Sequence, residues 1–189
     1  MSVQYNIPSD IKEISGVKLG FIGAISSYKL DFNLIKYIAK NRPDYNILLI
    51  GEIGEGEPGT NVDDLYDYKN IHFLGPKKYN ELPNYLSFMD AALLPNNIND
   101  YTDNMFPMKF FEYLSSGRNI VSVDLKSLKE FRDFCYLSKS YDEFVSNIDR
   151  VISGDIVPLD ERLSLAKKYT YESRTKKMIK IIEDELRLN

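Results

Sequence analysis

The sequence has little cysteine, little histidine and no long apolar run. Its one cysteine, Cys135, excludes an internal disulfide, and its one histidine, His72, leaves too few ligands for a Cys/His metal centre. We therefore expect no metal site and a reducing, cytoplasmic setting, with Cys135 as an inert core thiol and His72 as a packed strand residue. No apolar run approaches the about 18 residues of a membrane span, and the opening residues do not resemble a signal peptide.

The chain also lacks an excess of positive charge. It carries 28 acidic and 24 basic residues, for a formal net charge of -4. This balance gives no global electrostatic reason to expect a nucleic acid as the partner. With 189 residues, of which 43% are hydrophobic, the chain can bury one substantial core.

Short apolar runs alternate with stretches of helical periodicity from Val17 to Tyr141, which is typical of βα units on a parallel sheet. Strands are expected at 17–23, 46–51, 71–75, 90–95, 119–124 and, more weakly, 134–138. Helices are expected at 31–41, 62–68, 79–89, 107–117 and 127–133, followed by three helices over 142–188. Asp31 fits an N-cap, Pro107 a first helical turn and Gly117 a C-cap.

The pattern predicts a Rossmann-like, three-layer α/β domain whose mostly parallel sheet has about six strands and which closes with C-terminal helices. We assign residues 1–16 to a linker-like opening segment and residues 17–189 to the domain.

The stretch GEGEPG (Gly54, Gly56, Gly59) matches the dinucleotide pattern G-x-G-x-x-G, but its surroundings oppose a phosphate. Glu52, Glu55 and Glu57 interleave the glycines, and no Lys or Arg lies between Gly51 and Tyr68. Carboxylates repel an anion by about 1 kcal/mol each near a surface. We interpret GEGEPG as a solvated turn.

A better anion site begins at Pro107, where a helix starts after the fourth strand. Its free amides face the carboxyl end of the sheet, where open α/β folds bind ligands. Lys109 lies at the end of the helix dipole that disfavours a cation, which makes sense if an anion shares the site. Glu112, three residues on, suits the hydroxyls of a ribose. The alternative from spacing alone is a surface ion pair between Lys109 and Glu112.

At PMKFFEYLSSGRNIVS (107–122) the chain closely resembles the donor-binding half of GT-B glycosyltransferases of the family-four (group 1) type. GFIGAISSYKLDFNLIKYIAKNRPDYNILLIG (20–51) and NIHFLGPKKYNELPNYLSFMDAALLP (70–95) are similar to its first four βα units. The ending KKYTYESRTKKMIKII resembles the closing W-x-x-R helix, with Tyr171 in place of the tryptophan and Arg174 at the arginine. The resemblance covers about residues 17–182.

This resemblance implies that the chain is one half of a GT-B fold, which binds a nucleoside-diphosphate sugar as donor substrate and uses no other cofactor. It implies that Lys109 stabilises the departing diphosphate, in a mechanism that needs no metal, and that Glu112 accepts the ribose hydroxyls. The other donor-binding residues that it implies border the diphosphate, the sugar and the base: Gly23, Ala24, Ser26, Gly75, Pro76, Lys77, Asn104, Met105, Phe106 and Pro107.

Two positions depart from the family pattern. Asn104 stands where many members carry a second glutamate, and the loop GAISSY lacks the basic residue that often follows the first strand, which leaves only Lys29 further along. The resemblance also implies an N-terminal acceptor domain beyond this chain, without which we expect no sugar transfer. It places the enzyme in polysaccharide biosynthesis for the cell envelope.

Other interpretations stay open. The chain could be a non-catalytic nucleotide-binding or regulatory α/β module, or half of a sugar-nucleotide epimerase; the turn GAISS lacks the acidic pair of a receiver domain, and one histidine leaves few acid/base groups for an epimerase. The basic cluster Lys167, Lys168, Arg174, Lys176, Lys177 and Lys180 is either a solvated face or a peripheral contact with the inner face of the cell membrane. Tyr28, Tyr79 and Tyr101 could stack on a base or sugar, although most tyrosines must be packing.

Overall fold

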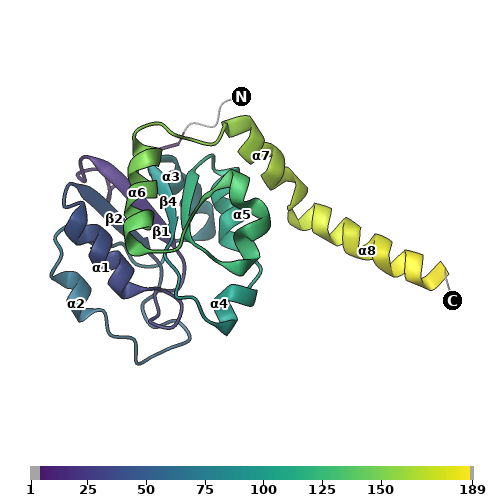
Figure 1. Ribbon diagram of the computed structural model, residues 1–189, viewed down its shortest axis with the longest axis horizontal. Helices are drawn as coiled ribbons and strands as arrows, with labels where there is room; N and C mark the ends of the chain where they lie inside the picture. Colours follow the sequence, from purple (N-terminus) through teal and green to yellow (C-terminus); the bar gives the residue numbers. More distant parts are fainter. Residues whose placement is uncertain (1–4, 188–189) are drawn as a thin grey trace.

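One six-stranded sheet organises the chain in the computed structural model, which describes residues 5–187 (Figure 1). All of the strand pairs are parallel, and the spatial order is β3-β2-β1-β4-β5-β6. The strands are β1 (Val17–Ile22), β2 (Tyr45–Ile50), β3 (Ile71–Phe73), β4 (Ala91–Leu94), β5 (Asn119–Val123) and β6 (Tyr136–Ser138). The predicted Rossmann-like α/β fold is confirmed.

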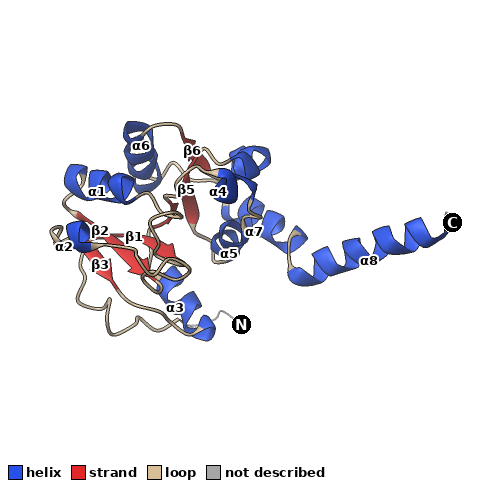
Figure 2. Cartoon of the chain, turned by 90° about the horizontal axis from the view of Figure 1, so that it is seen from below, coloured by secondary structure: helices blue, strands red, loops and turns tan. Residues whose placement is uncertain are grey.

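Helices cover both faces of the sheet. Figure 2 shows α1 and α6 on one side and α3 and α5 on the other, and α7 packs against α5. The α-helices are α1 (Phe32–Asn41), α2 (Asp63–Tyr66), α3 (Leu82–Ser87), α4 (Asp100–Asn104), α5 (Met108–Ser115), α6 (Tyr141–Ile152), α7 (Leu159–Lys168) and α8 (Tyr171–Arg187). Two 3₁₀ helices, η1 (Tyr79–Glu81) and η2 (Lys126–Phe134), complete the described residues.

Most of the predicted elements form within a residue or two of their expected bounds, and the capping residues behave as their types require. The Asp31 carboxylate accepts a hydrogen bond from the Leu34 amide at 3.0 Å, and Gly117 ends α5 with a φ of 77°. Pro107 lies just before α5, whose first residue is Met108. The segment predicted as a helix at 127–133 is 3₁₀ helix instead, and its backbone kinks at Phe131.

The opening segment packs onto the domain although it forms no helix or strand over residues 5–16. Ile11 is fully buried in the core. The Asp10 carboxylate accepts hydrogen bonds from the Lys77 ammonium at 2.7 Å and from the Tyr85 hydroxyl at 2.9 Å. Burial opposes the charged form of Asp10, but these donors prevail and lower the pKa of its carboxyl. The linker-like role of this segment stays a prediction.

The last helix, α8, extends away from the body of the domain (Figures 1 and 2). None of its side chains is buried. Within residues 5–187, no helix combines the length and the apolar character that crossing a membrane would require.

Candidate functional site

A cavity lies where the strand order of the sheet reverses, between β1 and β4. Open α/β sheets bind ligands at this position, beyond the carboxyl ends of the strands. The cavity, which we name the switch-point cavity, has a volume of about 290 Å³. Its wall combines the ends of β1 and β4 with the start of α5, and it includes the side chains of Lys29 and Lys109. The fold thus brings two cations to the carboxyl edge of the sheet.

The start of α5 carries Lys109 and Glu112. The Lys109 ammonium donates a hydrogen bond to the Glu112 carboxylate at 2.9 Å, so the ion pair considered from the spacing forms in this structure. Lys109 is 37% exposed and Glu112 is 28% exposed, which keeps both groups accessible. No acidic residue lies in the first turn of α5 to offset its dipole, so an anion would be stabilised there.

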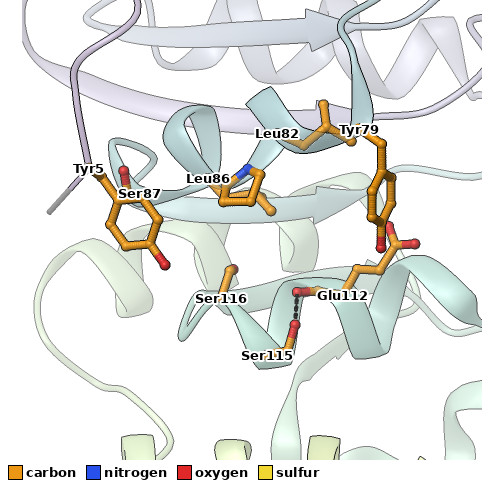
Figure 3. Close-up of a pocket in the computed structure, with 9 residues that line it drawn as sticks. Tyr5, Tyr79, Leu82, Leu86, Ser87, Glu112, Ser115 and Ser116 are labelled. Carbon is orange, nitrogen blue, oxygen red and sulfur yellow. Dashed lines mark hydrogen bonds between the residues drawn. The ribbon is translucent and has the colours of Figure 1, made fainter. Parts of the chain in front are cut away.

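Glu112 also borders a second hollow, which we name the α3–α5 groove (Figure 3). This groove has a volume of about 210 Å³ and runs between α3 and α5, with Tyr79 and Leu82 on its other wall. Figure 3 shows the Tyr79 ring and the Glu112 carboxylate at the same end of the groove. Lys109 lines the switch-point cavity and Glu112 lines the α3–α5 groove, so the cavity and the groove adjoin at the first turns of α5.

A buried tyrosine fixes α5 against β1. The Tyr113 hydroxyl accepts a hydrogen bond from the Ile22 amide at 2.8 Å, beside the cavity wall formed by Ile22 and Gly23. Complete burial raises the pKa of the Tyr113 hydroxyl far above its usual value, so it remains protonated. The contact sets the distance between the end of β1 and the start of α5.

The structure brings half of the predicted site residues together at the switch-point cavity. Its wall includes Gly23, Ala24, Met105, Phe106, Pro107 and Lys109. Glu112 lies in the adjoining groove.

The remaining predicted residues lie elsewhere and stay predictions. Ser26 is fully buried and its hydroxyl has no partner within residues 5–187. The exposed Asn104 side chain donates to the Asp100 carbonyl at 2.8 Å, at the end of α4. Gly75, Pro76 and Lys77 line neither hollow, and the Lys77 ammonium pairs with Asp10.

Lys29 lines the cavity, although it was not predicted as a site residue and was noted only as the remaining basic residue after the first strand. Its ammonium lies 5.3 Å from the ring centre of Tyr28 and 5.8 Å from that of Tyr101, within the range of a cation–π contact. The asparagine-rich run NNIN (96–99) holds its loop in place. The side-chain amide of Asn97 donates to the Leu30 carbonyl at 2.9 Å, and that of Asn99 donates to the Tyr28 carbonyl at 2.7 Å. The asparagine-rich run was the sequence feature that could have indicated a loop held by side-chain hydrogen bonds.

The GEGEPG loop contacts the same region through Glu57 and Gly54. The Glu57 carboxylate accepts hydrogen bonds from the Ser27 hydroxyl at 2.8 Å and from the Tyr28 amide at 3.1 Å. These bonds, led by that from Ser27, lower the pKa of Glu57. The Gly54 amide donates to the Ile25 carbonyl at 2.9 Å. The loop therefore supports the chain that follows β1, next to Gly23 and Ala24.

No cluster of three or more His, Cys, Asp or Glu side chains that could hold a metal ion occurs within residues 5–187. Cys135 is a buried free thiol, and burial raises its pKa to about 12. His72 is half-buried, and burial lowers its pKa. Its Nε2 lies 3.0 Å from the Asn46 side-chain oxygen, as expected for a packed strand residue.

A parallel sheet with a cationic cavity at its switch point defines a Rossmann-like ligand-binding domain. The chain matches the family model described as "Glycosyl transferases group 1" over residues 16–153. It therefore belongs to the group 1 glycosyltransferase family, and the resemblance stated from the sequence is confirmed.

Individual relatives agree with this assignment. The chain is 27% identical over 172 residues to TuaH of Bacillus subtilis strain 168, named as a teichuronic acid biosynthesis glycosyltransferase, and the match covers 87% of this chain and 43% of TuaH. It is similar in structure to HepE of Anabaena in complex with UDP and glucose, with a TM-score of 0.76, 16% identity and coverage of 95% of this chain and 53% of HepE.

A third relative is the sucrose-phosphate synthase of Thermosynechococcus elongatus, with a TM-score of 0.72, 12% identity and coverage of 98% of this chain and 50% of that one. The chain thus spans about half the length of each of these three proteins.

Proposed function

We propose that this chain is the nucleotide-sugar donor-binding half of a glycosyltransferase. The observation that carries the proposal is the placement of Lys29 and Lys109 on one cavity wall at the N-terminus of α5, with Glu112 in the adjoining groove. Two ammonium groups and the free amides of a helix start are suited to a diphosphate. A carboxylate one turn along is suited to the vicinal hydroxyls of a ribose. The base then lies in the α3–α5 groove, against Tyr79 and Leu82.

The transfer step in the whole enzyme follows from these charges. As the bond between the sugar and the diphosphate breaks, negative charge grows on the departing diphosphate. Lys109 and the start of α5 stabilise this charge in place, which lowers the barrier to departure. The acceptor, a glycan, a lipid or a small molecule, is held by an N-terminal half that this chain does not contain. By itself, we expect the chain to bind donor and to transfer no sugar.

The chemistry of the relatives supports a nucleoside-diphosphate sugar as the donor. HepE is described with UDP and glucose, and the name of TuaH refers to teichuronic acid. We propose on this basis that the whole enzyme acts in the cytoplasm, in polysaccharide biosynthesis for the cell envelope.

Titration with UDP, GDP, ADP and UDP-glucose tests the donor site. We expect at least one nucleoside diphosphate to bind in calorimetry and to raise the Tm, because a ligand that binds only the folded state stabilises it. Failure of all four to bind the folded chain would contradict the proposal.

The role of Glu112 is tested with ligands that differ only in the ribose. We expect the wild type to bind UDP about 10-fold more tightly than 2′,3′-dideoxy-UDP, because a hydrogen bond to a charged group contributes about 1.5–3 kcal/mol. Glu112→Gln should remove most of this preference, and Glu13→Gln, on the exposed opening segment, should keep it. Comparing the two ligands cancels any effect of releasing Lys109. An unchanged preference in Glu112→Gln would exclude the ribose contact.

We further propose a peripheral membrane contact through the basic C-terminal helices. On α8 the apolar side chains of Met178, Ile182 and Leu186 recur every four residues and are all more than half exposed. Lys176, Lys177 and Lys180 lie in the first part of the same helix, ahead of the acidic run at 183–185, and such a basic stretch beside exposed apolar side chains suits an anionic lipid surface.

Cosedimentation with vesicles containing phosphatidylglycerol should therefore be strong at low salt and weak at high salt. Reversing Lys176, Lys177 and Lys180 to Glu should lower the bound fraction at least about 10-fold, because each lysine near the surface contributes about 1 kcal/mol. The matched control reverses the exposed Lys12, Lys40 and Lys69, which changes the net charge equally. Equal loss in both triple variants would show that only net charge matters and would contradict a specific contact.

A further inference from the structure

The first turn of α8 reaches the wall of the switch-point cavity, although the rest of the helix stands away from the domain. The guanidinium carbon of Arg174 lies 3.9 Å from the ring centre of Phe106. Its Nη1 donates a hydrogen bond to the Met108 sulfur at 3.5 Å. Phe106 and Met108 both line the cavity, whereas Arg174 does not. Arg174 therefore touches the outer side of the segment whose inner side faces the ligand site.

Phe106 is held between this guanidinium and an aromatic stack. Its ring lies 5.5 Å from that of Phe111 at an interplanar angle of 17°, and the Phe111 ring lies 4.3 Å from that of Tyr169 at 15°. Phe131 meets both Phe111 and Tyr169 edge-on at 5.3 Å. The stack joins the chain between α7 and α8 to the start of α5.

Hydrogen bonds hold the connection between α7 and α8, just before Arg174, in place. The Thr170 hydroxyl accepts a hydrogen bond from the Ser173 amide at 3.1 Å, and the Ser173 hydroxyl donates to the Lys167 carbonyl at 3.2 Å. The segment that Arg174 contacts is less constrained, because Met105, Phe106 and Pro107 lie between α4 and α5, outside either helix. Besides the hydrogen bond that the Met108 amide donates to the Phe106 carbonyl at 2.8 Å, contacts of its side chains hold its path.

We infer that Arg174 is a positioning residue for the donor diphosphate. Arg174 acts by holding Phe106 and Met108, so that the start of α5 faces the cavity. The inference rests on the proposed function, since it assumes that the cavity receives a diphosphate. Lys109 directly follows Met108, so a shift of the segment moves the ammonium and the first amides of α5 together. The diphosphate end of the ligand then loses affinity while the base and ribose end keeps theirs.

Hydrogen exchange of the ligand-free chain tests the mechanical step. In Arg174→Ala we expect the backbone amides between residues 105 and 110, which exclude Pro107 because proline has no N–H, to exchange roughly 5-fold faster or more; this corresponds to the loss of one partly buried cation–π contact. Arg174→Lys, which keeps the charge but not the planar group, should restore part of the protection. Arg187→Ala, which removes an exposed arginine at the far end of the same helix, is the matched control and should leave these amides unchanged.

Binding of UDP and UMP tests the functional step with the same variants. We expect Arg174→Ala to lower the ratio of UDP affinity to UMP affinity roughly 5-fold, with UMP affinity itself unchanged and partial rescue in Arg174→Lys. General destabilisation would instead speed exchange throughout the chain and leave the ratio unchanged, and that result would overturn the inference. Exchange at 105–110 that matches the wild type would overturn it as well. A wild-type chain that binds neither nucleotide would count against the proposed function, while the exchange measurement would still decide whether Arg174 holds the segment.

Discussion

Replacing Lys109 with alanine should lower the affinity of the chain for UDP about 10-fold or more, with a smaller effect on UMP. Lys109 lines the cavity at the start of α5, where we propose that the diphosphate binds. A charge-assisted hydrogen bond to a phosphate contributes about twice as much as a neutral one, which gives this order of loss. In an enzyme that also contains the acceptor half, the same change should slow transfer by about 10²-fold, as when one donor to a developing negative charge is removed.

Calorimetry with UDP and UMP measures the first effect, and a transfer assay with the complete enzyme measures the second. Lys109→Arg should retain part of both, because a guanidinium also binds phosphate oxygens. Lys40→Ala, at an exposed position in the last turn of α1, serves as the control. If Lys109→Ala bound UDP and transferred sugar like the wild type, Lys109 would have no part in donor binding or catalysis.

The ion pair with Glu112 gives Lys109 a structural role in addition to the proposed binding of a diphosphate. Lys109→Ala distinguishes the two roles. An i,i+3 pair on a helix stabilises folding by only about 0.2–0.5 kcal/mol. The pair also offsets the unfavourable position of a lysine at the start of α5. A purely structural lysine would therefore change the Tm slightly and leave the ratio of UDP to UMP affinity unchanged. If Lys109 binds the diphosphate, Lys109→Ala should lower the ratio of UDP to UMP affinity, because in the wild type the diphosphate competes with Glu112 for the ammonium.

The fold was predictable because four of the six strands contain a buried run of at least four residues and helical segments lie between the strands. β1 and β2 pair over six residues each, and the last four residues of each strand are buried, as the runs LGFI and ILLI indicate. The prediction missed α4, because five polar residues show no apolar period and only the Asn99 cap marks their start. Short elements fixed by side-chain capping leave little periodic signal.

From residue spacing alone, without the family resemblance, the candidate site was predictable only where one helix carries it. Lys109 and Glu112 lie on one helix, so their spacing alone indicates that they are near each other. Lys29 joins them through a loop whose path depends on Asn97 and Asn99, which are far along the chain. Ser26 belongs to that loop but is turned into the core. Which residue of an irregular loop faces a cavity follows from tertiary hydrogen bonds and not from local pattern.

Gly51, the residue that directly follows β2, is the glycine whose replacement we expect to lower stability most. Its φ is +155°, and a Cβ built on it would lie 1.8 Å from the Gly23 carbonyl oxygen. Because the obstacle is backbone and not a flexible side chain, the strands must move apart at the cavity wall. We expect Gly51→Ala to lower the free energy of unfolding by roughly 3 kcal/mol. In a chain of this size that loss corresponds to a fall in Tm of roughly 6–12 °C.

Gly59→Ala is the matched control, because Gly59 has no positive φ and a Cβ there would meet nothing within 4 Å. We expect its stability to stay within about 0.5 kcal/mol of the wild type. Its affinity for UDP should also be unchanged, although Gly59 is the third glycine of the G-x-G-x-x-G pattern. Gly51→Ala should weaken UDP binding as well, since the displaced Gly23 belongs to the cavity wall. Denaturant unfolding and UDP titration of both variants test these expectations. Weaker UDP binding in Gly59→Ala would indicate that the ligand binds at the glycine loop. Weaker binding in Gly51→Ala alone would support binding at the cavity between β1 and α5.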